Sequence, residues 1–181
     1  MAIKPILFNT EMVRAILDGR KSCTRRLVKP EPQGYFEVSE EPLYIYDTDG
    51  NQGKITSPYQ PGDILYVRET WKKAPNGYFY YEDWQRDDIA DVTKWKPSIH
   101  MPKEAARIWL KVTDVRVERL QDMTDDDAEA EGCFDYTSTA LGFPDVWDST
   151  IKKSDLDSYG WTANPWVWVI EFERCEKPEG V

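Results

Sequence analysis

A lysine and a threonine three residues apart are the strongest candidates for chemistry in this chain. Lys21 and Thr24 lie in the run Gly-Arg-Lys-Ser-Cys-Thr-Arg-Arg at 19–26. An amine beside a hydroxyl can activate that hydroxyl as a nucleophile without a histidine, provided that the amine is neutral. Burial and neighbouring positive charges favour the neutral amine. The same spacing also fits a solvated basic loop in which the lysine caps helix carbonyls.

A carboxylate on the apolar face of a predicted strand is the second candidate. With a period of two, one face of residues 64–71 carries Leu65, Val67, Glu69 and Trp71. A buried, unpaired carboxyl has a raised pKa, which suits Glu69 to a role as general acid. Two alternatives stay open. The apolar face ends before Glu69, which then lies in water, or Glu69 pairs with Lys21 and opposes a base role for that amine.

Three further side chains are suited to holding a base or a phosphate. Arg68 offers a guanidinium for forked hydrogen bonds, and Trp71 offers a ring for stacking. Arg26 places another cation near the threonine. An oxyanion would be stabilised by Arg26 or by backbone N–H groups of an irregular turn expected over residues 20–25.

The charge balance and the scarcity of histidine narrow the chemistry further. In 181 residues, 33 acidic side chains oppose 23 basic ones, a formal charge of −10, which argues against a broad duplex-binding face. The one histidine, His100, excludes a zinc site with two or three histidines. The three cysteines share no metal-binding spacing. We therefore expect no metal and reduced thiols in a cytoplasmic protein; the mechanism implied by the family resemblance described below also needs no organic cofactor.

Membrane association is not expected either. No apolar run approaches the roughly 18 residues of a membrane span. The first residues, Met-Ala-Ile-Lys-Pro-Ile-Leu-Phe-Asn, lack the apolar stretch of a signal peptide.

Apolar periodicity and turn residues predict an α+β fold with a small mixed or antiparallel barrel. Strands are expected at 5–8, 43–47, 64–71, 78–81, 107–119 and 166–172, with a bulge near 113–114 and an Asp49-Gly50 turn. Helices are expected from Thr10 to Asp18, from Thr124 to Glu131 and over 143–153. The acidic second helix is interpreted as a solvated face, and Trp166 and Trp168 as core.

Several of these landmarks resemble the ASCH domain family. Gly19-x-Lys21-x-x-x-x-Arg26, placed after a first strand and helix, resembles its signature. The Pro61-Gly62-Asp63 turn leading into residues 66–71 looks like the next landmark. Residues 105–132 and the closing strand at 166–172 are similar to longer phage and prophage proteins of this type.

This resemblance implies a single domain over 1–181, a PUA-like small mixed β-barrel flanked by short helices, with a cleft beside the first helix. Residues 72–103 and 133–165 exceed the minimal domain and are expected to be insertions; the first is interpreted as a lid. Bacterial members of the family are amidohydrolases that remove the acyl group from N4-acetylcytidine by means of lysine, threonine and glutamate.

Matched to this sequence, those three roles fall on Lys21, Thr24 and Glu69. Lys21 would take the proton of Thr24, which attacks the acyl carbonyl, and Glu69 would protonate the departing cytosine. The expected partner is therefore a small modified nucleoside, without a membrane. Other members of the family are proposed to bind or cleave RNA, so a non-catalytic module or a ribonuclease acting on single-stranded RNA is the alternative.

Overall fold

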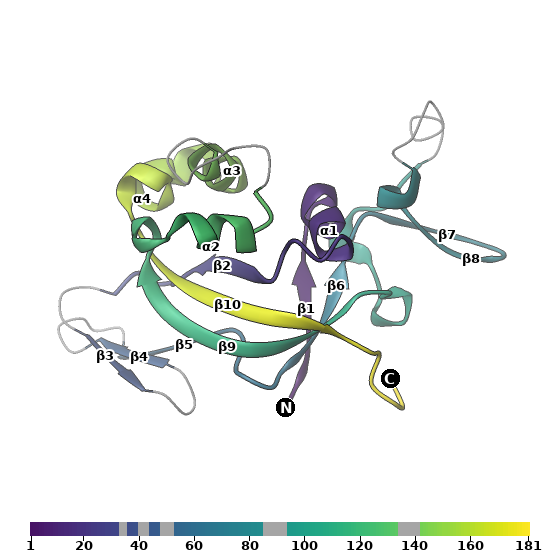
Figure 1. Cartoon of the computed structure of the whole chain (residues 1–181), viewed down its shortest axis with the longest axis horizontal. Helices are drawn as coiled ribbons and strands as arrows, with labels where there is room; N and C mark the ends of the chain where they lie inside the picture. Colours follow the sequence, from purple (N-terminus) through teal and green to yellow (C-terminus); the bar gives the residue numbers. More distant parts are fainter. Residues whose placement is uncertain (33–35, 40–43, 48–52, 85–93, 134–141) are drawn as a thin grey trace.

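A five-stranded mixed sheet is the largest unit of the structure. The computed structural model describes residues 1–32, 36–39, 44–47, 53–84, 94–133 and 142–181. In spatial order the sheet contains β1 (Ile3–Leu7), β6 (Ile64–Arg68), β9 (Trp109–Arg119), β10 (Trp166–Cys175) and β2 (Cys23–Leu27). β1 runs parallel to β6, and the other neighbours are antiparallel. β9 and β10 lie side by side and curve together (Figure 1).

The sheet edges β1 and β2 are joined by a side chain instead of a backbone ladder. Within the described residues the two strands do not pair, so the α+β class is confirmed while the predicted barrel is an open sheet. Arg26 of β2 donates from Nη2 to the carbonyl of Leu7 (3.1 Å), and its guanidinium lies 5.4 Å from the centroid of the Phe8 ring. The arginine thus connects the two edges directly.

The bulge predicted in the longest strand is present and keeps its apolar residues on one face. Val112 pairs with Phe172, whereas Asp114 pairs with Glu171, so Thr113 is the extra residue. This residue resets the alternation of β9. Valines on both sides of the bulge therefore join one core cluster, which also contains the buried Trp168, as predicted for that tryptophan.

Short helices gather beside the β2 edge. They are α1 (Thr10–Leu17), α2 (Asp125–Ala130), α3 (Phe143–Thr150) and α4 (Leu156–Tyr159). Thr10 is the first residue of α1 and not its cap, because Asn9 accepts the capping bond from the N–H of Met12. Thr124 caps α2 as predicted, in a reciprocal pair with Asp127. Figure 1 shows α2, α3 and α4 together on one side of the sheet.

The segment that follows β6 packs against α1. It contains β7 (Trp71–Ala74), β8 (Gly77–Tyr80) and the short 3₁₀ turns η1 (Tyr81–Trp84), η3 (Ser98–His100) and η4 (Lys103–Ala105). Arg14 of α1 donates to Glu82 of η1 (2.7 Å), which anchors the segment. The β7–β8 hairpin projects away from α3 and α4 (Figure 1). The single strand predicted over 64–71 is thus two strands in the structure: the first ends at Arg68, and the second begins at Trp71.

A separate three-stranded sheet contains β3 (Phe36–Ser39), β4 (Tyr44–Asp47) and β5 (Gly53–Thr56). The sequence predicted β4 alone, and the Asp49-Gly50 turn lies outside the described residues. Another 3₁₀ turn, η5 (Leu120–Asp122), follows β9, and η6 (Lys153–Asp155) and η7 (Trp161–Ala163) flank α4. Among the described residues, no helix has the length and apolar character needed to cross a membrane.

Candidate functional site

Thr24 lies on a β-strand, not in the irregular turn predicted around it. The strand forms because β10 presents an edge to pair with, and Thr24 is opposite Ile170 in the ladder. The turn is confined to residues 20–22, whose backbone N–H groups are already used. Those of Arg20 and Lys21 donate to Ala15 O (2.8 and 3.0 Å), and that of Ser22 donates to Ala130 O (2.9 Å). These amides cannot serve as the oxyanion donors that the sequence suggested.

The amine of Lys21 is completely buried and fully hydrogen-bonded. The exposed fraction of the side chain is 0%. Its Nζ donates to Cys23 O (2.7 Å), Glu131 O (2.9 Å) and Glu131 Oε2 (2.6 Å). All three partners are acceptors, so the three hydrogen-bonding positions of the amine are used within the protein. The solvated basic loop considered from the sequence is therefore wrong for this residue.

The carboxylate beside Lys21 belongs to Glu131, which the sequence analysis placed on a solvated helix face. Glu131 caps the C-terminal end of α2 and is buried. A negative charge at a helix C-terminus opposes the helix dipole, so this position needs a cationic partner. An acidic residue at the C-terminal end of a predicted helix was therefore the sequence signal that could have indicated this ion pair. Gly132, with φ +89°, lets the chain pass so close to α1 that a Cβ there would lie 2.8 Å from Ala15 Cβ.

A second buried cation, Arg25, binds the same carboxylate. Its Nη1 lies 3.5 Å from Glu131 Oε1, and its Nη2 lies 3.2 Å from Asp127 Oδ1. Burial acts to raise the pKa of Asp127, but hydrogen bonds from Thr124 and Arg25 outweigh it and lower that pKa. Lys21, Arg25 and Glu131 thus form a buried charge cluster between β2 and α2, which the partly exposed Asp127 completes.

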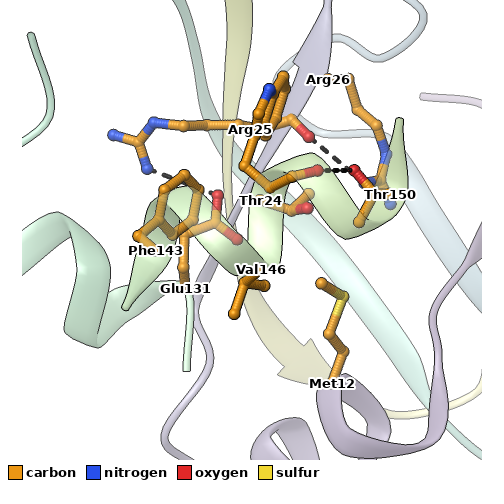
Figure 2. Close-up of a pocket in the computed structure, with 9 residues that line it drawn as sticks. Met12, Thr24, Arg25, Arg26, Glu131, Phe143, Val146 and Thr150 are labelled. Carbon is orange, nitrogen blue, oxygen red and sulfur yellow. Dashed lines mark hydrogen bonds and ion pairs between the residues drawn. The ribbon is translucent and has the colours of Figure 1, made fainter. Parts of the chain in front are cut away.

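A pocket opens from this cluster between β2, α1 and α3 (Figure 2). Its empty space is about 290 Å³, part of which is open to solvent. The lining residues are Met12, Thr24, Arg25, Arg26, Glu131, Phe143, Val146, Trp147 and Thr150. Within the described part of the chain, the Thr24 side chain makes no hydrogen bond. Its hydroxyl is thus unengaged, and Glu131 is among the residues that line the same pocket.

Glu69 is buried on the predicted face, 2% exposed, but it belongs to a different cluster. Arg107 forms a bidentate ion pair with its carboxylate. The distances from Nε to Oε1 and from Nη2 to Oε2 are both 2.9 Å. Arg107 also donates to Asp83 (2.7 Å). Burial raises the pKa of Glu69, and the arginine opposes that rise. Neither alternative left open by the sequence occurs: Glu69 is not in water, and its ion pair is not with Lys21.

Of the three predicted substrate-binding residues, only Arg26 lines the Thr24 pocket. Its Nη1 and Nη2 both donate to backbone carbonyls, and burial lowers its pKa. Arg68 donates from Nε to Met101 O (2.8 Å). Trp71 packs in a cluster with Met101 and Trp109, and is 4% exposed. Among the described residues, no group of three or more metal-ligating side chains comes together.

Comparison with known proteins establishes the fold. No family model matches the sequence, and no curated protein matches it. The structure is similar to the crystal structure of an ASCH domain from Lactobacillus crispatus JV V101, with a TM-score of 0.51. The two sequences are 13% identical, and the match covers 96% of this chain and 79% of that one. The chain therefore has the fold of an ASCH domain, and the resemblance drawn from the sequence is confirmed at that level.

Proposed function

We propose that this ASCH-fold protein is an amidohydrolase that removes the acyl group from an N4-acylated cytidine. One observation carries the proposal: Thr24 and Glu131 line one pocket, and Glu131 Oε2 lies 2.6 Å from Lys21 Nζ. A hydroxyl, an amine and a carboxyl are the groups that an acyl transfer through a threonine ester requires. The carboxyl role assigned to Glu69 from the sequence therefore passes to Glu131.

The Lys21–Glu131 pair supplies the acid and the base together. As an ammonium, Lys21 has no lone pair with which to accept the threonine proton. Transfer of one proton across the short hydrogen bond converts the pair into a neutral amine and a neutral carboxyl. A site that excludes water favours such neutral forms, because separated charges are poorly solvated there. The amine then accepts a proton and the carboxyl donates one.

Turnover proceeds in two acyl transfers. Thr24 Oγ1 attacks the acyl carbonyl carbon while its proton passes to the Lys21–Glu131 pair. The bond from that carbon to N4 breaks, and the proton of Glu131 goes to N4, which leaves as the amino group of cytidine. A water molecule then attacks the threonine ester, giving the free carboxylic acid and restoring the hydroxyl.

A free nucleoside suits the pocket better than a long nucleic acid. The pocket that includes Thr24 has about 290 Å³ of empty space, part of it open to solvent, which is the scale of a small-molecule site. The net charge of −10 opposes the phosphate contacts on which RNA affinity depends. A steep loss of binding to single-stranded RNA with salt, without acyl release, would favour the RNA-binding alternative instead.

The proposal is tested by incubating the protein with N4-acetylcytidine and following the ultraviolet change to cytidine. Thr24→Val keeps the shape of the side chain and removes the nucleophile, so turnover should fall by at least about a thousandfold. Thr150→Val is the matched control, because the Thr150 hydroxyl lies at the same pocket but already donates to Trp147 O (2.7 Å). Full activity of Thr24→Val would exclude this mechanism.

A further inference from the structure

The wall of the pocket opposite β2 is built by α3, which lies within the segment beyond the minimal domain. Phe143, Val146 and Trp147 all line the pocket from this one helix. Their spacing of three and four residues places them on one helix face. Met12 of α1 adds a fourth apolar side chain, and Figure 2 shows Met12 and Val146 near one another beside Thr24.

We propose that this apolar wall is an acyl-binding site that restricts the substrate to short, uncharged, aliphatic acyl groups. The inference rests on the proposed function, in which Thr24 attacks the acyl carbonyl carbon. The rest of the acyl chain then points toward α3. Valine, methionine and aromatic side chains favour contact with hydrocarbon, and each buried methylene raises affinity roughly fourfold. Longer acyl chains should thus gain until the wall is reached.

The wall is fixed in position, so it limits length instead of adapting. Trp147 donates from Nε1 to Tyr159 O (2.9 Å), and Asp148 accepts from the backbone N–H of Trp161 (2.7 Å). The Phe143 ring packs 6.3 Å from Trp147 and 6.0 Å from Trp161, between ring centroids. Two hydrogen bonds and two ring contacts therefore hold α3 in place. Val146 is the smallest of the apolar lining residues and sets the depth available to the acyl chain.

An acyl group that carries its own carboxylate would approach Arg25, whose charge is already balanced by carboxylates. The charge of Arg25 is shared by Glu118, Asp127 and Glu131, at 3.6, 3.2 and 3.5 Å. Both terminal nitrogens of Arg26 donate to backbone carbonyls. An anionic chain would lie against hydrocarbon and close to the Glu131 carboxylate, which is unfavourable.

The test measures kcat/KM for a series of N4-acylcytidines: acetyl, propionyl, isobutyryl, benzoyl and succinyl. For the wild type we expect kcat/KM to rise about fourfold per added methylene from acetyl to isobutyryl. Benzoyl and succinyl substrates should fall at least about tenfold below isobutyryl. Val146→Ala should raise the benzoyl-to-acetyl ratio at least about tenfold, and Val146→Phe should lower the isobutyryl-to-acetyl ratio by a similar factor.

Asp145→Ala is the matched control, since Asp145 lies on the same helix but is exposed and outside the pocket. It should leave the whole profile unchanged. Hydrolysis with a flat acyl profile, or equal shifts in the Asp145 and Val146 variants, would overturn the acyl-wall inference while leaving the proposed function intact. Failure to hydrolyse every member of the series would instead overturn the proposed function, and the inference with it.

Discussion

The Nζ atom of Lys21 lies 2.6 Å from Oε2 of Glu131, although the two residues are 110 positions apart in the sequence. Lys21 enters from the turn after α1, and Glu131 closes α2. The backbone carbonyl of Glu131 accepts a second bond from the same amine (2.9 Å). The Lys21 side chain therefore fixes the end of α2 against α1. The pocket beside Thr24 depends on this contact.

Removing one partner of this ion pair should strongly lower the free energy of unfolding. Lys21→Met leaves the Glu131 carboxylate buried without its closest cation, so we expect a loss of about 3 to 5 kcal/mol in the free energy of unfolding. The double variant Lys21→Met/Glu131→Leu should lose distinctly less than the sum of the two single variants. Urea unfolding of all four proteins checks this, and additive losses would show that the pair is not coupled.

The close approach of α2 to α1 requires glycine at position 132. In Gly132→Ala the new methyl group would meet Ala15 Cβ at 2.8 Å and Lys21 Cβ at 3.3 Å, in a backbone with φ +89°. We expect a loss of more than about 2 kcal/mol in the free energy of unfolding, together with loss of activity, because Glu131 is displaced from Lys21.

Gly62→Ala separates the effect of the positive φ from the effect of the steric contact in Gly132→Ala. Gly62 has a similar φ of +86°, but no atom lies within 4 Å of the place that a Cβ would occupy. This variant should therefore lose only the backbone contribution, roughly 1 kcal/mol, and keep its activity. Equal thermal stability of the two variants would contradict the close-packing account.

Glu69 should make stability depend on pH in a way that distinguishes it from an ordinary ion-paired carboxylate. Because burial raises its pKa above the usual 4.5, the folded state holds the proton more tightly than the unfolded state. The free energy of unfolding should therefore fall as pH rises from 4.5 through the raised value, and stay level above it. Urea unfolding of wild type and Glu69→Gln from pH 4 to 8 measures this contribution as a difference.

Asp63 provides a comparison with the opposite sign. Burial acts to raise its pKa, but hydrogen bonds from Lys4, Ala2 and Gln60 outweigh it and hold the pKa below 3.8. Its contribution should be present above pH 3.8 and disappear as pH falls through the lowered value. Matching slopes for Glu69→Gln and Asp63→Asn, relative to wild type, would contradict both assignments.

Local sequence rules were sufficient for the two longest strands. The alternation in 107–119 and 166–172 predicted β9 and β10, and the change of parity predicted the bulge at Thr113. Strand β2 was missed, because residues 23–27 carry charges at positions that are typical of a loop. They form a strand because β10 offers a paired edge, and Arg25 is neutralised by acids more than ninety residues away.

The site was only partly visible in the sequence for a similar reason. Local spacing made Lys21 and Thr24 candidates, and strand parity placed Glu69 on the apolar face, where it is buried, although the sequence left open that it lies in water. Which carboxylate lies beside the lysine depends on how α2 docks against α1, and no local pattern encodes that. Arg107, which binds Glu69, lies 38 residues further along the chain. The residues of α3 were beyond sequence reasoning because nothing indicated where that helix packs.

The most direct test compares the two carboxylates in the same reaction. Hydrolysis of N4-acetylcytidine should fall by about a hundredfold or more in Glu131→Gln, because the proton donor is lost. Glu69→Gln should keep kcat within a few-fold of wild type wherever the variant is folded, as judged by circular dichroism. Wild-type turnover by Glu131→Gln, or abolished turnover in a folded Glu69→Gln protein, would contradict the account.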